Sequence, residues 1–137
     1  MNRNDLIGWE TTLIAERCAE ETRSFYRGLP NSEVFCFELF RRAIVLPDIE
    51  ARLAVGTTYT PQVRKWVANY APSLDRVDQE FLADEEIDRF WHSYTAEKLN
   101  HATGLKQILA YWHICVKNLS LNHQRESKVR AVRSRDE

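Results

Sequence analysis

The feature that most constrains this chain is an uninterrupted helical repeat in its last third. Between residues 105 and 125 apolar side chains return every three or four positions, and no Gly or Pro interrupts them. Such spacing puts them on one face of an amphipathic helix. They are Leu105, Ile108, Leu109, Trp112, Cys115, Val116 and Leu119. The other face is polar and free of acids, with Lys106, His113, Lys117, Ser120, Gln124 and Lys128. A helix that is apolar on one side and basic on the other favours a nucleic-acid partner.

The rest of the chain repeats this helical pattern. Only 4 Gly and 4 Pro occur among 137 residues, so turns are few and elements are long. We predict an all-α fold, a compact bundle of about five helices with an N-terminal helical leader. The expected helices cover residues 5–27, 32–46, 48–70, 74–94 and 104–125, with a kink or short break near Thr60 and a loop at 95–103. A continuation of the last helix to Arg133 stays open. The expected domains are the leader 1–30, a helical domain 31–128 and a basic, flexible tail 129–137.

Charge is unevenly distributed along the sequence. Residues 117–137 hold six Lys or Arg against three acids, a net charge of +3. Residues 75–88 hold seven acids and one Arg, and Glu80, Asp84 and Asp88 recur at the spacing of one helix face. We therefore expect the acidic segment and the basic end to serve different partners. Two alternatives stay open: the acids form a solvated helix face, and the basic end is a solubilising tail.

The cysteines and the N-terminal residues indicate the cellular compartment of the protein. Cys18, Cys36 and Cys115 are odd in number and widely spaced, which favours reduced thiols in a cytoplasm. The first residues lack the apolar core of a signal peptide, and no apolar run approaches the roughly 18 residues of a membrane span. The sequence thus predicts a soluble, cytoplasmic protein with no membrane partner.

No pattern of residues points to catalysis. The sequence has no Gly-rich phosphate loop and no nucleophile accompanied by a base. His92, His101, His113 and His123 show no metal-ligand spacing among themselves or with the cysteines. We expect no enzymatic activity, no cofactor and no metal.

Two segments carry a resemblance to a known family. Residues 79–91 read QEFLADEEIDRFW, and residues 108–125 read ILAYWHICVKNLSLNHQR. With FCFELFRRAI at 35–44, their order and spacing make residues 33–128 resemble region 2 of the bacterial sigma-70 family of RNA polymerase sigma factors. The likeness is to the small, alternative (extracytoplasmic-function-like) type, in a divergent form with an added leader.

The resemblance implies two working surfaces and their partners. The helix at 74–94 would dock on the clamp helices of the large subunit of core RNA polymerase, through Glu80, Phe81, Asp84, Asp88 and Trp91. The helix at 105–125, with the loop before it, would hold the melted promoter −10 element on the non-template strand during transcription initiation. The residues expected to bind DNA are Asn100, His101, Lys106, Tyr111, His113, Lys117, Asn118, Asn122, Arg125 and Lys128. An anti-sigma or other regulatory protein is a further implied partner.

Departures from the family pattern leave an alternative open. Phe81 and Asp84 stand where many members carry Asp and Gln, and Asn122 replaces an Asp of the last helix. The chain also ends before any counterpart of the region that binds the −35 element, so it is either a fragment or a protein with one DNA-reading region. The alternative is a helical protein-interaction module that keeps this fold without reading promoters.

Overall fold

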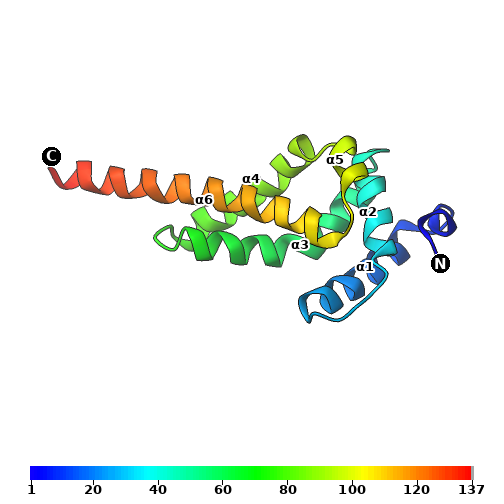
Figure 1. Cartoon of the computed structure of the whole chain (residues 1–137). Helices are drawn as coiled ribbons and strands as arrows, with labels where there is room; N and C mark the ends of the chain where they lie inside the picture. Colours follow the sequence, from blue (N-terminus) through cyan, green and yellow to red (C-terminus); the bar gives the residue numbers. More distant parts are fainter. Residues whose placement is uncertain (137) are drawn as a thin grey trace. The chain divides into compact units, whose positions relative to one another are not determined.

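The computed structural model describes residues 1–136, and all regular elements in this range are helices (Figure 1). The prediction of an all-α fold is confirmed, with six α-helices and one short 3-10 helix where about five helices are expected. The elements are η1 (Arg3–Leu6), α1 (Thr11–Tyr26), α2 (Val34–Ile44), α3 (Ile49–Tyr70), α4 (Arg76–Ser93), α5 (Ala96–His101) and α6 (Leu105–Asp136).

The chain divides into two compact units, each made of two separate stretches. Unit 1 comprises Met1–Tyr59 and Ser93–Ile108, and unit 2 comprises Thr60–His92 with the described residues from Leu109 onward. The expected domain boundaries after residues 30 and 128 stay predictions. In the structure the leader belongs to the same unit as α2 and α5, while α3 and α6 each contribute to both units.

The leader is broken where a single helix over residues 5–27 is expected. Asn2 caps η1, and its side chain and that of Asp5 form a reciprocal capping box. The chain then turns through residues 7–9 before α1 begins. The carbonyl oxygens of Leu6 and Ile7 accept hydrogen bonds from the Arg42 guanidinium, at 2.8 and 3.2 Å. These carbonyls are therefore satisfied by a distant side chain and need no continuing helix.

The break expected near Thr60 does not occur, and α3 runs through Pro61. Proline inside a helix costs about 3 kcal/mol. The buried stripe of α3 nevertheless continues on both sides of it, through Val55, Tyr59 and Val63. Burying such side chains contributes roughly 1.5–3 kcal/mol each, which is enough to offset the proline.

The C-terminal part also differs from expectation. Residues 96–101 of the expected loop form α5, which Thr95 caps through its side-chain oxygen. The last helix continues to Asp136, so the continuation to residue 133 that the sequence leaves open is found. The flexible tail expected from residue 129 is helical as far as Asp136. No Gly or Pro occurs after residue 104, so nothing in this segment ends a helix.

In unit 1, α1 and α2 are joined by a disulfide. Cys18 and Cys36 lie 18 residues apart in sequence, and their Cα atoms are 4.5 Å apart. The prediction of reduced thiols is thus wrong for this pair, because the turn between the two helices brings the cysteines together. Beside them the Thr22 and Tyr59 hydroxyls share a hydrogen bond of 2.8 Å, and burial raises the pKa of Tyr59. Cys115, the third cysteine, is half-buried and lies outside this disulfide.

Two glutamates in unit 1 cap helices to which they do not belong. The Glu21 carboxylate accepts a hydrogen bond from the Cys36 backbone N–H in the first turn of α2, at 2.8 Å. Burial nevertheless raises the pKa of Glu21 above its usual value. Glu33 accepts from the Leu105 N–H at 2.7 Å, where α6 begins. A carboxylate at a helix N-terminus satisfies a free N–H and meets the positive end of the helix dipole.

The core of unit 2 is aromatic. The rings of Phe90 in α4 and Trp112 in α6 stack with centroids 4.1 Å apart, and both are buried. The inward faces predicted for α4 and α6 are largely confirmed. Ser120 and Gln124, predicted on the polar face of the last helix, are buried instead. The Gln124 side-chain oxygen accepts a hydrogen bond from the Ser73 backbone N–H at 3.1 Å. The buried amide thus satisfies a backbone donor of the loop between α3 and α4.

Candidate nucleic-acid interface and docking face

One face of α4 holds all five residues expected to bind polymerase. Glu80, Phe81, Asp84, Asp88 and Trp91 follow one another at spacings that keep them on one side of a helix, together with Val77. We call these six residues the α4 face. Val77 and Phe81 are 73% and 72% exposed, and Asp84 and Asp88 are also exposed. Glu80 and Trp91 are half-buried, and Arg76 forms an ion pair with Glu80 at 3.3 Å.

Glu86 departs from its expected role in the acidic run. It is only 3% exposed, whereas the sequence pattern makes it a candidate for a solvated helix face. Burial raises the pKa of its carboxyl from 4.5 to about 7, and nearby Arg89 partly opposes this rise. Near neutral pH the Glu86 carboxyl is therefore partly protonated. Because it is also buried, Glu86 does not add a negative charge to the α4 face.

Along α6, three of the expected DNA-binding residues form an exposed stripe. Asn118, Asn122 and Arg125 recur at spacings of four and three, so they lie on one side of the helix. Lys117 and Lys128 are exposed on the flank of this stripe, and the half-buried Tyr111 stands at its start. We call these six residues the α6 face. All of its polar members apart from Tyr111 are open to solvent.

His113 is set apart from the α6 face. Its ring stacks on Trp66 of α3 with centroids 4.6 Å apart, and its Nε2 shares a 2.9 Å hydrogen bond with the Tyr70 hydroxyl. Burial and the nearby Lys117 lower the pKa of His113. A neutral, stacked imidazole contributes no charge to a phosphate contact, so we assign His113 to the packing between α3 and α6.

The remaining three expected DNA-binding residues belong to unit 1. Asn100 and His101 are exposed at the end of α5, and Lys106 is exposed in the first turn of α6. The Nδ1 atom of His101 lies 2.8 Å from the Glu97 carbonyl oxygen, which fixes the ring against its own helix. In the structure these residues stand on helices, whereas the sequence predicts a loop for the first two.

Charge distinguishes the two faces. The α6 face carries three cations, and the whole of α6 carries seven Lys or Arg against two acids, Glu126 and Asp136, a net charge of +5. The exposed acids of the α4 face are Asp84 and Asp88. Basic side chains at this density attract phosphates and make binding depend on salt.

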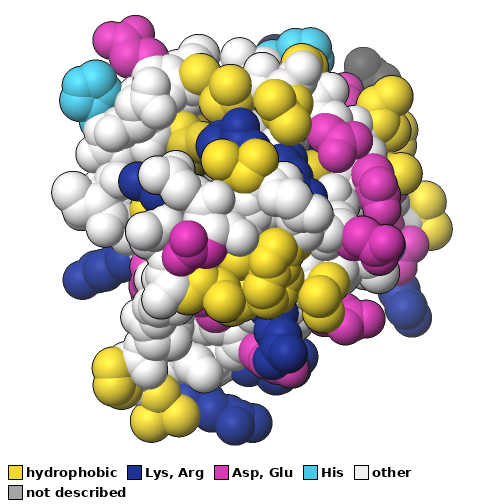
Figure 2. All heavy atoms as spheres, turned by 90° about the vertical axis from the view of Figure 1, so that its right-hand side faces the viewer, with side chains coloured by type: hydrophobic (Ala, Val, Ile, Leu, Met, Phe, Trp, Pro, Cys, Tyr) yellow, Lys and Arg dark blue, Asp and Glu magenta, His cyan; other side chains and the backbone are white. Residues whose placement is uncertain are grey.

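Exposed apolar side chains also occur in unit 1. Leu46, Ile49 and Leu53, around the start of α3, are all exposed. Figure 2 shows hydrophobic side chains gathered in patches on one face of the molecule, with Lys and Arg side chains among them. Contiguous apolar surface of this kind is common where proteins meet partners.

Comparisons with known proteins identify no relative: no family model, no curated protein and no solved structure matches the chain. Within residues 1–136, no three His, Cys, Asp or Glu side chains gather as metal ligands would. None of the helices described is both long enough and apolar enough to cross a membrane.

Proposed function

We propose that this protein is a sigma factor region 2-like protein that docks on core RNA polymerase through the α4 face. The α6 face would hold a single strand of melted promoter DNA, and the protein would have no catalytic activity of its own. The observation that carries the proposal is the α6 face itself. It aligns two amides and a guanidinium on one exposed side of a helix, with lysines beside them and no acid among them.

The chemistry of this face suits an unpaired strand. Asn118 and Asn122 stand one turn apart and offer both donors and acceptors to base edges. Arg125, Lys117 and Lys128 offer cations to phosphates, and Tyr111 offers a ring for stacking. Stacking one base on an aromatic side chain is worth roughly 1–3 kcal/mol, so a contact with Tyr111 would add to the hydrogen bonds and phosphate contacts of the other five residues.

The direct test is a binding titration with a fluorescent −10-like single strand. Lys117→Glu with Arg125→Glu should abolish binding without unfolding the protein. Two phosphate contacts would be lost, so any residual binding should show a log–log salt slope shallower by about 1.4. The matched control is Arg23→Glu with Arg27→Glu, which makes the same charge change on exposed positions at the end of α1 and should bind normally.

A second candidate function rests on the apolar centre of the α4 face. Val77 and Phe81 are among the most exposed large hydrophobic residues of the chain. Covering Phe81 with a partner would contribute roughly 1.5–3 kcal/mol, which favours a protein-binding surface whether or not α6 binds DNA. The protein would then be a helical interaction module without promoter reading.

Two assays run together separate the candidates. Capture of core polymerase that is lost on Phe81→Ser, combined with strand binding, supports the sigma-like function. Capture without strand binding supports the interaction module. Strand binding that survives the double charge reversal contradicts the assignment of the α6 face.

A further inference from the structure

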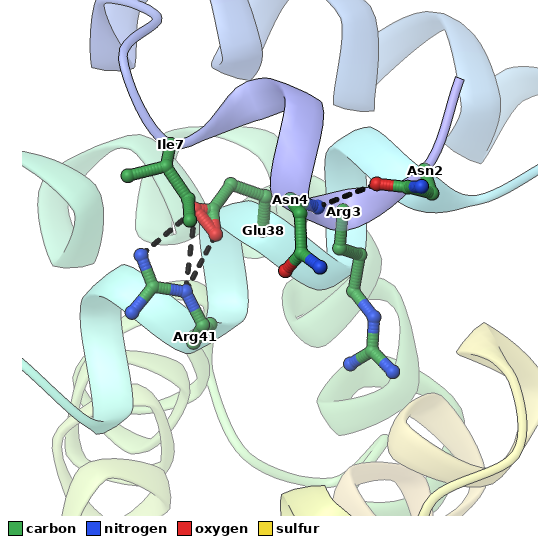
Figure 3. Close-up of a pocket in the computed structure, with 6 residues that line it drawn as sticks. All are labelled: Asn2, Arg3, Asn4, Ile7, Glu38 and Arg41. Carbon is green, nitrogen blue, oxygen red and sulfur yellow. Dashed lines mark hydrogen bonds and ion pairs between the residues drawn. The ribbon is translucent and has the colours of Figure 1, made fainter.

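The leader and α2 enclose a hollow on unit 1, which we call the N-terminal pocket (Figure 3). Its volume is about 560 Å³, within the range of sites that bind small molecules. It forms because η1 turns back over α2 and is held there by the Arg42 guanidinium. Its lining residues are Asn2, Arg3, Asn4, Ile7, Glu38 and Arg41.

The wall formed by α2 carries Glu38 and Arg41, and Arg42 is not among its lining residues. The Glu38 side chain is 1% exposed, and its carboxylate is shared by two guanidinium groups. Arg41 donates through Nε and, at 3.0 Å, through Nη2, while Arg42 donates through Nε at 3.3 Å. One carboxylate thus faces two cations, and the Arg41 Nη1 group is not engaged by Glu38.

The wall formed by the leader adds a second cation, Arg3, and an amide, Asn4. Arg3 lies over the Phe37 ring, 5.0 Å from its centroid, and this contact leaves its N–H groups available. Among residues 1–136, neither the Arg3 nor the Asn4 side chain makes a hydrogen bond to another side chain. Figure 3 shows the Arg3 and Asn4 side chains extending to the same side of the η1 turn, with Arg41 at the other edge of the hollow.

We propose that the N-terminal pocket binds the phosphate group of a small phosphorylated molecule. A phosphate monoester carries a charge of about −1.5 to −2 near neutral pH and presents three acceptor oxygens. The lining side chains sum to +1 with Glu38 counted, and two guanidinium groups and an amide around one hollow offer several N–H donors to these oxygens. A carboxylate has one charge and two oxygens, so it would leave part of this donor set unused.

The pocket also provides a surface for the organic part of such a ligand. Ile7 is exposed on its wall and offers apolar contact beside the polar donors. None of the residues of the α4 face or the α6 face lines it. The site is therefore separate from the proposed polymerase and DNA contacts and does not depend on them.

The proposal is tested by calorimetric titration of the full chain with inorganic phosphate, with adenosine monophosphate and with acetate. Any purification tag belongs after residue 137, because the lining residues begin directly after Met1. We expect saturable binding of phosphate and the monophosphate, with a dissociation constant below about 1 mM, and none of acetate. Arg3→Gln and Asn4→Ala should each weaken binding about tenfold, as the loss of one charge-assisted hydrogen bond does.

The control is Arg27→Gln, an exposed arginine at the end of α1 that does not line the pocket, and it should bind like the unmodified protein. Arg41 is left unchanged because it also holds Glu38. The absence of saturable phosphate binding would overturn the proposal, as would equal binding by Arg3→Gln or equal weakening by Arg27→Gln. Two further outcomes would reject a phosphate monoester as the ligand. One is binding of acetate that depends on Arg3. The other is binding that depends on Arg3 but occurs only with an oligonucleotide that has no terminal phosphate.

Discussion

Arg42→Met should destabilise unit 1 far more than the same change at its neighbour Arg41. The Arg42 side chain is 7% exposed and touches four acceptors. It donates to the Thr11 hydroxyl at 2.9 Å, to the carbonyls of Leu6 and Ile7, and to Glu38. Methionine keeps most of the apolar stem but removes every donor, so the buried acceptors lose their partner.

The expected cost follows from this geometry. Glu38 keeps Arg41 in this variant, so the cost comes from the three other acceptors, the carbonyls of Leu6 and Ile7 and the Thr11 hydroxyl. Leaving a buried acceptor without its donor costs about 1–3 kcal/mol, and for the three together we expect a loss of about 3–5 kcal/mol. With a typical slope of about 2 kcal/mol per molar urea, the unfolding midpoint should fall by roughly 1.5–2.5 M. Arg41→Met is the matched comparison: its side chain is 33% exposed and Glu38 keeps Arg42, so its cost should be nearer 1 kcal/mol.

Urea unfolding followed by circular dichroism measures both variants. A double-mutant cycle adds a further check, since Glu38→Leu with Arg42→Met removes both charges and should cost less than the sum of the single changes. If Arg42→Met stays within about 1 kcal/mol of the unmodified protein, or costs no more than Arg41→Met, the network does not anchor the leader.

Three further predictions concern single groups. Because the pKa of Glu86 is raised to about 7, its favourable contribution is complete below pH 4.5 and is lost as pH rises through 7. The free energy of unfolding of Glu86→Gln should therefore rise by up to about 3 kcal/mol relative to that of the unmodified protein as the pH goes from 5 to 8. A difference in urea midpoint between the two proteins that is the same at both pH values would contradict this. Reducing the Cys18–Cys36 disulfide, which spans 18 residues, should cost about 3 kcal/mol, and Cys36→Ser should remove the sensitivity of the melting temperature to reductant. Ser120→Ala should stabilise by about 1 kcal/mol, because the buried hydroxyl has no hydrogen-bond partner in the described structure; a lower melting temperature would disprove it.

Much of the candidate interface could be predicted because it depends on helical spacing alone. Asn118, Asn122 and Arg125 share a face wherever the helix is placed, and the buried stripe around Trp112 sets which face points outward. His113 could not be assigned in this way. Its spacing fits the polar side of α6, but in the structure its ring packs against the rings of Trp66 and Tyr70 in α3.

The N-terminal pocket lay outside sequence reasoning, although one signal for it is present. Glu38 precedes Arg41 and Arg42 by three and four residues, the spacing of ion pairs within a helix. That pattern predicts a local pair on α2. It does not predict that Arg42 also reaches the carbonyl oxygens of η1, more than 30 positions away, and so builds a hollow between the leader and the helix.

The sequence by itself determined the all-helical class and most inward faces, because both follow from the local repeat of apolar residues and the scarcity of Gly and Pro. Tertiary structure alone decided which distant groups meet. It paired Cys18 with Cys36 and buried Glu86 within an acidic run. It also brought the Glu33 carboxylate to the N–H of Leu105, which lies 72 residues further along the chain at the start of α6. A helical repeat specifies direction around one axis, whereas pairing, capping and desolvation depend on where a second element lies.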